Sequence, residues 1–240
     1  MLSSLGSLRQ QCIQCMVLLC VDANWYDSLN LSYSMLIVSG NTIFLALGAS
    51  DQPSSKPFGW LKSLVSIASF LLGCFVFAST RLVNPKSRGT LATSFVAQSL
   101  FIILAAILVQ AGVVPQPDGI VTESGSKVNL LELLPLGFLA FQSGGQIVTS
   151  RILGFNEVPT TVLTSVYCDI ASDPKILARD NVKRNRRIAA VIFILVGGIA
   201  GGWISRSSAG MSTSLWIAAA IKVMIACSWS LWRPKNSVQI

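Results

Sequence analysis

Apolar residues are gathered into eight runs along the chain, and polar stretches separate the runs. The longer runs have about the 20 residues that a helix needs to cross a bilayer, whereas the second and sixth are shorter and typical of segments that enter the membrane and return. The pattern predicts an all-α integral membrane protein, a polytopic helical bundle with about six full crossings and two short broken segments. The runs cover residues 12–29, 35–49, 61–80, 91–113, 130–153, 160–171, 188–205 and 211–232.

The order of the runs occurs twice, which indicates an internal two-fold sequence repeat. Repeat 1 covers about residues 12–113, a polar connection covers 114–129, and repeat 2 covers about 130–232 of a single transmembrane domain, 1–240. Asp22 and Gln146 are 124 positions apart, and Gly73 and Gly198 are 125 apart. A steady offset favours an ancient duplication over chance similarity between apolar helices, and many transporters are built from such repeats.

Two topologies agree with the runs. If all eight cross, the repeats are parallel and 12 positive residues face one side against five on the other. If the two short runs return, six crossings remain, the repeats are inverted, and the count becomes 13 to four. We favour six crossings because the short runs have re-entrant length. In both topologies the positive-inside rule places the stretch from Lys175 to Arg187 and both termini in the cytoplasm, although it does not name the membrane.

Composition excludes several classes of protein. Charged residues make up 12% of the chain, apolar residues 52%, and the mean hydropathy is +0.64. The net charge of +8 is carried mainly between the apolar runs, so we expect a lipid bilayer as partner rather than nucleic acid. Because the chain has no histidine, catalytic triads and histidine-ligated metals are excluded, and we expect neither a metal nor a cofactor.

Two carboxylates interrupt the first apolar run. Asp22 and Asp27 flank Trp25 and Tyr26, and a carboxylate at membrane depth is costly unless it is paired, hydrated or protonated. One interpretation is a polar cavity in which Asp22 binds a cation, a proton or a polar ligand. The alternative is a loop between the first two runs, in which Asp22 caps a helix.

Small polar residues occur inside both short runs. Ser39, Gly40, Asn41 and Thr42 can let the backbone leave helical geometry and form a binding site, or they can be the close contact of two helices. Thr164, Ser165 and Asp169 have the same place in the second half, and Gly144, Gly145 and Gln146 are predicted to break the fifth run.

Lys222 lies in the middle of the last run, too deep to reach the membrane surface easily. An unpaired ammonium at this depth costs about 3 kcal/mol. We therefore expect Lys222 to pair with a buried carboxylate, with Asp22, Glu132 and Asp169 as the candidates. The alternative is a lysine that lines a hydrated crevice.

Several of these segments resemble a known family. Val21-Asp22-Ala23 and Ser39-Gly40-Asn41-Thr42 resemble the V-D-A and T-G-N-T signatures of the YoaK-like family of small integral membrane proteins. Gly145-Gln146 and the stretch 159–169 resemble its second-half motifs, although Ser165 and Val166 replace the Gly and Asn of that motif. The family has no established function, but the resemblance implies a membrane protein often regarded as a transporter. The divergent second motif is similar to that of fungal members, whose genes often lie beside genes of secondary metabolism.

Two functions follow from these features. The first is a transporter or permease for a small molecule or ion, based on the repeat, the short runs and the intramembrane charges. The second is a membrane-embedded enzyme, such as a cyclase, isomerase or epoxide-opening hydrolase, in which Asp22, Asp27 or Asp169 serves as acid or base on a lipophilic intermediate. The substrate is unknown, and assembly as a homo-oligomer is left open.

Overall fold

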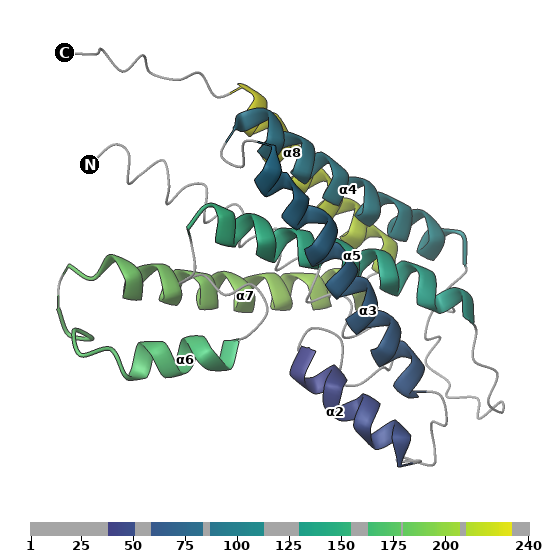
Figure 1. The fold of residues 1–240 in the computed structure, drawn as a ribbon, viewed down its shortest axis with the longest axis horizontal. Helices are drawn as coiled ribbons and strands as arrows, with labels where there is room; N and C mark the ends of the chain where they lie inside the picture. Colours follow the sequence, from purple (N-terminus) through teal and green to yellow (C-terminus); the bar gives the residue numbers. More distant parts are fainter. Residues whose placement is uncertain are drawn as a thin grey trace.

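The computed structural model describes residues 38–50, 59–83, 87–112, 130–154, 163–178, 180–206 and 210–231. These residues form helices and short turns, and no strand occurs among them, which confirms the all-α class (Figure 1). The elements are α2 (Val38–Ala49), α3 (Gly59–Ala78), η1 (Ser79–Leu82), α4 (Arg88–Gln110), η2 (Leu130–Glu132), α5 (Leu133–Ile152), α6 (Leu163–Ala171), α7 (Val182–Arg206) and α8 (Gly210–Leu231).

Most helix boundaries lie within three residues of the apolar runs, but α7 begins six residues before its run. Asn181 explains this early start, because its side-chain oxygen accepts a hydrogen bond of 3.1 Å from the backbone N–H of Arg184 and caps the helix. Ser87 has the same role at α4, where it accepts from the Thr90 N–H at 3.2 Å. The first predicted run, 12–29, lies outside the described residues.

Three of the described helices are long and apolar enough to cross a membrane. They are α3 from Trp60 to Ala78, α4 from Arg88 to Gln110, and α8 from Ser212 to Leu231. Large apolar side chains on these helices are exposed in the isolated chain, among them Phe75 at 75% and Leu100 at 54%. Exposed apolar surface of this kind is stable against lipid, which indicates a membrane protein.

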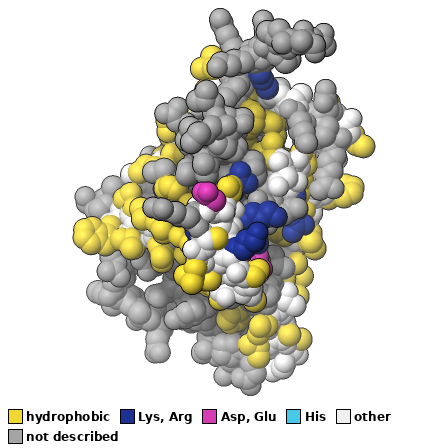
Figure 2. Space-filling model, turned by 90° about the vertical axis from the view of Figure 1, so that its left-hand side faces the viewer, with side chains coloured by type: hydrophobic (Ala, Val, Ile, Leu, Met, Phe, Trp, Pro, Cys, Tyr) yellow, Lys and Arg dark blue, Asp and Glu magenta, His cyan; other side chains and the backbone are white. Residues whose placement is uncertain are grey.

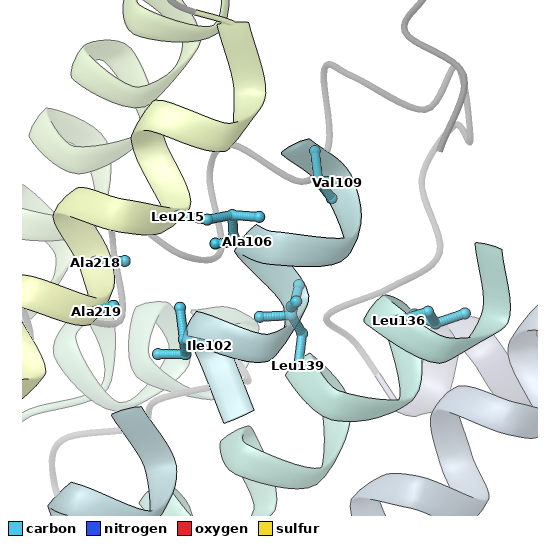
Figure 3. Close-up of a cluster of buried hydrophobic side chains, with 9 residues drawn as sticks. Ile102, Ala106, Val109, Leu136, Leu139, Leu215, Ala218 and Ala219 are labelled. Atoms are coloured by element: carbon cyan, nitrogen blue, oxygen red, sulfur yellow. The ribbon is translucent and has the colours of Figure 1, made fainter. Parts of the chain in front are cut away.

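The core lies where α4, α5 and α8 pack together (Figure 3). Four alanines, three of them fully buried, bring the helices close at this point, and larger aliphatic side chains fill the layers beside them. The buried members of the cluster are Ile102, Ala105, Ala106, Val109, Leu136, Leu139, Leu215, Ala218 and Ala219.

Glycines bring α3 and α5 into direct backbone contact. A Cβ atom added at Gly73 would overlap the backbone carbonyl of Phe141, and one added at Gly144 would lie 2.5 Å from the carbonyl oxygen of Phe70. The prediction that Gly144 and Gly145 break the fifth run is therefore wrong: α5 is continuous, and these residues are glycines because α3 leaves no room for a side chain.

The predicted break in the second run is not a break either. Gly40, Asn41 and Thr42 lie within α2, a continuous helix of 12 residues that packs on α3. Asn41 is 2% exposed, and its side-chain amide donates a hydrogen bond of 3.1 Å to the hydroxyl of Ser66. The alternative interpretation, a close contact between two helices, is the one that the structure supports.

Candidate functional site

A polar group at the centre of the bundle is formed by one lysine and two glutamines. Lys222 of α8 is fully buried, and its ammonium donates a hydrogen bond of 2.7 Å to the side-chain oxygen of Gln98 on α4. The same ammonium donates to the side-chain oxygen of Gln142 on α5. The ammonium of Lys222 therefore joins three helices from distant parts of the sequence through hydrogen bonds.

All three residues lie near the midpoints of their helices. Gln98 is the eleventh of the 23 residues of α4, Gln142 the tenth of the 20 of α5, and Lys222 the thirteenth of the 22 of α8. At 1.5 Å per residue, the Lys222 backbone lies at least about 13 Å from either end of α8. We call Gln98, Gln142 and Lys222 the central polar layer.

Hydrogen bonds continue from this layer along the interface of α4 and α5. The amide nitrogen of Gln98 donates to the hydroxyl of Ser94 at 3.2 Å, and that hydroxyl lies 3.3 Å from the hydroxyl of Thr149. Gln146, predicted as a site residue, lies one turn after Gln142 and is 4% exposed. Lys222, Gln98, Ser94 and Thr149 therefore form a connected polar path along the interface, and Gln146 is buried on the same helix as Gln142 and Thr149.

The other predicted site residues that the structure describes lie apart from one another, on different helices. Asp169 on α6 accepts an ion pair of 3.0 Å from Arg187 on α7, and its side chain is 53% exposed. Thr164 also lies on α6, which packs on α7. Asn41 lies between α2 and α3. Asp22 and Asp27 lie outside the described residues, as does the stretch 159–162.

Glu132 is not the partner of Lys222 that the sequence offered. Its carboxylate accepts a hydrogen bond and ion pair of 2.7 Å from Lys62, near the start of α3. Both side chains are about 15% exposed, at 16% and 14%. The pair joins the first turn of α3 to the end of η2, directly before α5, so Glu132 stabilises an end of the bundle rather than the central polar layer.

Gln98 is the site residue that sequence reasoning missed. It is an amide near the middle of an apolar run, which is a weak signal by itself. A stronger signal was its separation from Lys222 of 124 positions, the offset that relates Asp22 to Gln146 in the predicted repeat. The two residues are in contact. Within the described ranges, no three Cys, Asp or Glu residues are close enough to hold a metal ion.

Positive side chains gather at the connection of α6 and α7. Lys175 and Lys183 are exposed, and Arg184 and Arg187 lie beside them. Figure 2 faces this end of the molecule and shows Lys and Arg side chains together, with apolar side chains around them. This is the stretch from Lys175 to Arg187 that the sequence predicts to be cytoplasmic.

The connection between α6 and α7 is held by Asp173. Its carboxylate accepts hydrogen bonds of 2.8 Å from the backbone N–H of Lys175 and 2.8 Å from the side-chain amide of Asn181. These two bonds hold the pKa of Asp173 below its ordinary value. Arg184 adds a hydrogen bond of 2.9 Å to the carbonyl oxygen of Ala178. Hydrogen bonds thus hold the connection, in which the apolar side chains of Ile176 and Leu177 are exposed.

We expect Asp173→Ala to loosen this connection, because the Lys175 N–H and the Asn181 amide lose their acceptor. Hydrogen–deuterium exchange of the backbone amides of residues 175–178 should become several-fold faster at neutral pH, and Asp180→Ala, a change at an exposed aspartate, is the matched control. A depressed pKa stabilises the fold above the ordinary carboxyl value, about pH 4, and this contribution is lost as the pH falls through the folded value. The difference between wild type and variant should therefore persist at about pH 4 and vanish only when the pH falls below the lowered pKa of Asp173. An equal exchange rate at neutral pH would contradict this assignment.

Comparison with known proteins identifies a family but no activity. No curated protein and no solved structure matches the chain. A family model described as a protein of unknown function (DUF1275) matches residues 17–228, which include α2 to α7 and most of α8. Since the match covers most of the sequence, the chain belongs to the DUF1275 family of proteins of unknown function.

Proposed function

We propose that this protein is a multi-pass membrane transporter for a small molecule or ion. The observation that carries the proposal is the central polar layer, in which a lysine with no exposed surface lies midway along an apolar helix. Ionisable groups at this depth are expensive, and they commonly mark a substrate or ion pathway. Transporters built from repeats bind their substrates near the midplane, where the repeats meet.

Helix directions support inverted repeats. Gln98 contacts Lys222, and the side-chain oxygen of Gln110 accepts a hydrogen bond of 3.0 Å from the indole of Trp216. As α4 proceeds from residue 98 to 110, α8 is followed backwards from 222 to 216, so the two helices are antiparallel. They have equivalent places in the two halves of the sequence. Repeat units that lie in opposite directions are the usual arrangement in several families of secondary transporter.

The lengths of α2 and α6 favour six crossings over eight. They contain 12 and nine residues, which correspond to about 18 Å and about 14 Å of helix, against a hydrocarbon thickness of about 30 Å. With two re-entrant helices, each half contributes three crossings and the second half is inverted relative to the first. The stretch from Lys175 to Arg187 and both termini then face the cytoplasm.

This orientation predicts labelling from opposite sides. In a variant without native cysteines, a cysteine at Lys183 should react with an impermeant maleimide only when the cytoplasmic side is accessible. A cysteine at Asn30, which lies outside the described residues, should react only from the other side. Labelling of both positions from the same side would exclude the proposed topology.

A transporter is favoured over a membrane-embedded enzyme because one of the three candidate acids is not buried. Asp169 is half exposed and paired with Arg187, whereas an acid that protonates an alkene or epoxide needs a buried carboxyl group. A lipophilic product of secondary metabolism is one cargo that the proposal includes.

The test is flux into sealed vesicles. Purified protein in liposomes should raise the uptake of a small organic solute above that of protein-free vesicles, and Lys222→Gln should remove the increase. Asp22→Asn, at the carboxylate predicted from sequence, should also remove it if Asp22 belongs to the same path. Chemical conversion of the solute by detergent-solubilised protein, without transport, would favour the enzyme instead.

A further inference from the structure

An almost fully exposed leucine lies in the connection between α6 and α7. The side chain of Leu177 is 96% exposed, and Ile176 and Val182, close to it in the sequence, are exposed as well. The guanidinium of Arg184 donates hydrogen bonds to the carbonyl oxygens of Ile176 and Ala178, the latter at 2.9 Å. These two residues flank Leu177, so hydrogen bonds hold the backbone on both sides of it. Apolar side chains exposed together indicate a surface that contacts a partner or a membrane.

Positive charge accompanies these apolar side chains. Residues 173–187 contain six Lys and Arg against two Asp, and the side chains of Lys175 and Lys183 are exposed. Figure 2 shows Lys and Arg side chains together at this end of the molecule, with apolar side chains around them. An anionic bilayer has the complementary chemistry, because lipid phosphates lie directly above the hydrocarbon.

The apolar part of α7 brings this connection to the depth of the lipid headgroups. Residues 188–205 contain no charged side chain and span about 27 Å of helix, close to the hydrocarbon thickness of about 30 Å. Leu195 and Ile199 are exposed in this part, as expected of a helix that contacts lipid. Val182 lies about 9 Å before Ile188, and the headgroup region is about 5–8 Å thick on each side. This position favours a lipid surface over a soluble partner.

We propose that the connection of α6 and α7 anchors the protein to an anionic leaflet. The helix α7 enters the hydrocarbon at Ile188, and Leu177 inserts among the headgroups. Lys175 and Lys183 bind the phosphates of anionic phospholipids, since a lysine can lay its aliphatic stem on apolar surface while its ammonium reaches a phosphate. The inference names a lipid partner and is independent of the transport proposal.

Insertion of Leu177 is tested with an environment-sensitive nitrobenzoxadiazole probe. The probe is attached to Leu177→Cys in the full chain without native cysteines, in nanodiscs of phosphatidylcholine alone or mixed with phosphatidylserine. Its emission should move to shorter wavelength in the mixed nanodiscs, and lipids with a nitroxide near the headgroup should quench it. The matched control is the same probe on Asp180→Cys, an exposed position in the same connection, and this probe should stay in water.

The role of the lysines is tested with Leu177 unchanged. Lys175→Gln and Lys183→Gln should each lower the affinity of the purified full chain for phosphatidylserine by about fivefold, measured by native mass spectrometry in detergent. Both changes keep the backbone N–H that Asp173 binds. Arg151→Gln removes the same charge at an exposed position at the end of α5 and should leave the affinity unchanged. Monodisperse elution checks that each variant folds.

Four results would overturn the proposal. The first is equal emission of the two probes in mixed nanodiscs, and the second is equal emission of the Leu177 probe in both kinds of nanodisc. The third is a phosphatidylserine affinity that neither lysine variant lowers. The fourth is a spectral shift in detergent that grows with protein concentration, which would assign Leu177 to a contact between two copies of the chain.

Discussion

Replacing Lys222 with methionine is expected to lower the free energy of unfolding in detergent by about 2–4 kcal/mol. Methionine fills similar space, but the side-chain oxygens of Gln98 and Gln142 lose the hydrogen bonds that the ammonium donates. A buried acceptor left without a donor costs about 1–3 kcal/mol. Removing a buried charge returns part of this cost. Thermal or denaturant unfolding measures the change, and the exposed Lys183→Met should alter it by less than about 0.5 kcal/mol.

A double-mutant cycle shows whether Lys222 and Gln98 act together. Gln98→Leu removes one acceptor, so the double variant should be less destabilised than the sum of the two single variants, by about 0.5–3 kcal/mol. The same cycle with Asp22→Asn tests the pairing predicted from sequence. Glu132→Gln should show no such coupling, because Glu132 pairs with Lys62 at the end of α3. Strictly additive effects of Lys222→Met and Gln98→Leu would contradict the contact.

Replacing Gly73 with alanine is expected to destabilise the bundle by about 3 kcal/mol or more. The added methyl group would overlap the carbonyl group of Phe141, and backbone within a helix cannot move aside as a side chain can. Separation of α3 from α5 would also disturb the Lys62–Glu132 pair at one end of the contact. The measurement is the yield of monodisperse protein together with its unfolding midpoint.

Other glycines provide a graded control series. At Gly137 the nearest atom to an added Cβ is the hydroxyl of Ser69 at 3.2 Å, which can rotate away, so Gly137→Ala should cost less than Gly73→Ala. At Gly89, in the first turn of α4, nothing lies within 4 Å, and alanine should be neutral or slightly stabilising. Equal effects at Gly73 and Gly89 would mean that α3 and α5 are not in backbone contact.

The positions of the helices could be predicted because a long apolar run is by itself enough to indicate a membrane helix. Seven of the eight runs correspond to described helices, and the polar connection at 114–129 lies between α4 and α5. The early start of α7 could not be predicted from apolar length, because its first turns, from Lys183 to Arg187, are polar. Those turns form a helix through the Asn181 cap rather than through burial.

The internal contacts could be predicted only in part, because they depend on which helix faces which. A glycine in an apolar run can mark a break in a helix or a place where another helix packs closely. Only the position of α3 shows that Gly144 is at a close helix contact. The depth of Lys222 followed from its place in the run. Its hydrogen bonds to Gln98 and Gln142 did not, since the argument from charge directed attention to carboxylates.

The contact between Gln98 and Lys222 has a consequence for energetics. In the proposed transporter with inverted repeats, the two residues have equivalent places in the halves of the chain, and they meet where antiparallel α4 and α8 cross. Two identical halves would make an inward-open and an outward-open state mirror each other, with equal free energies. A glutamine in one half and a lysine in the other remove that degeneracy. We expect the resting population to favour one side, with Lys222→Gln moving it toward an even distribution.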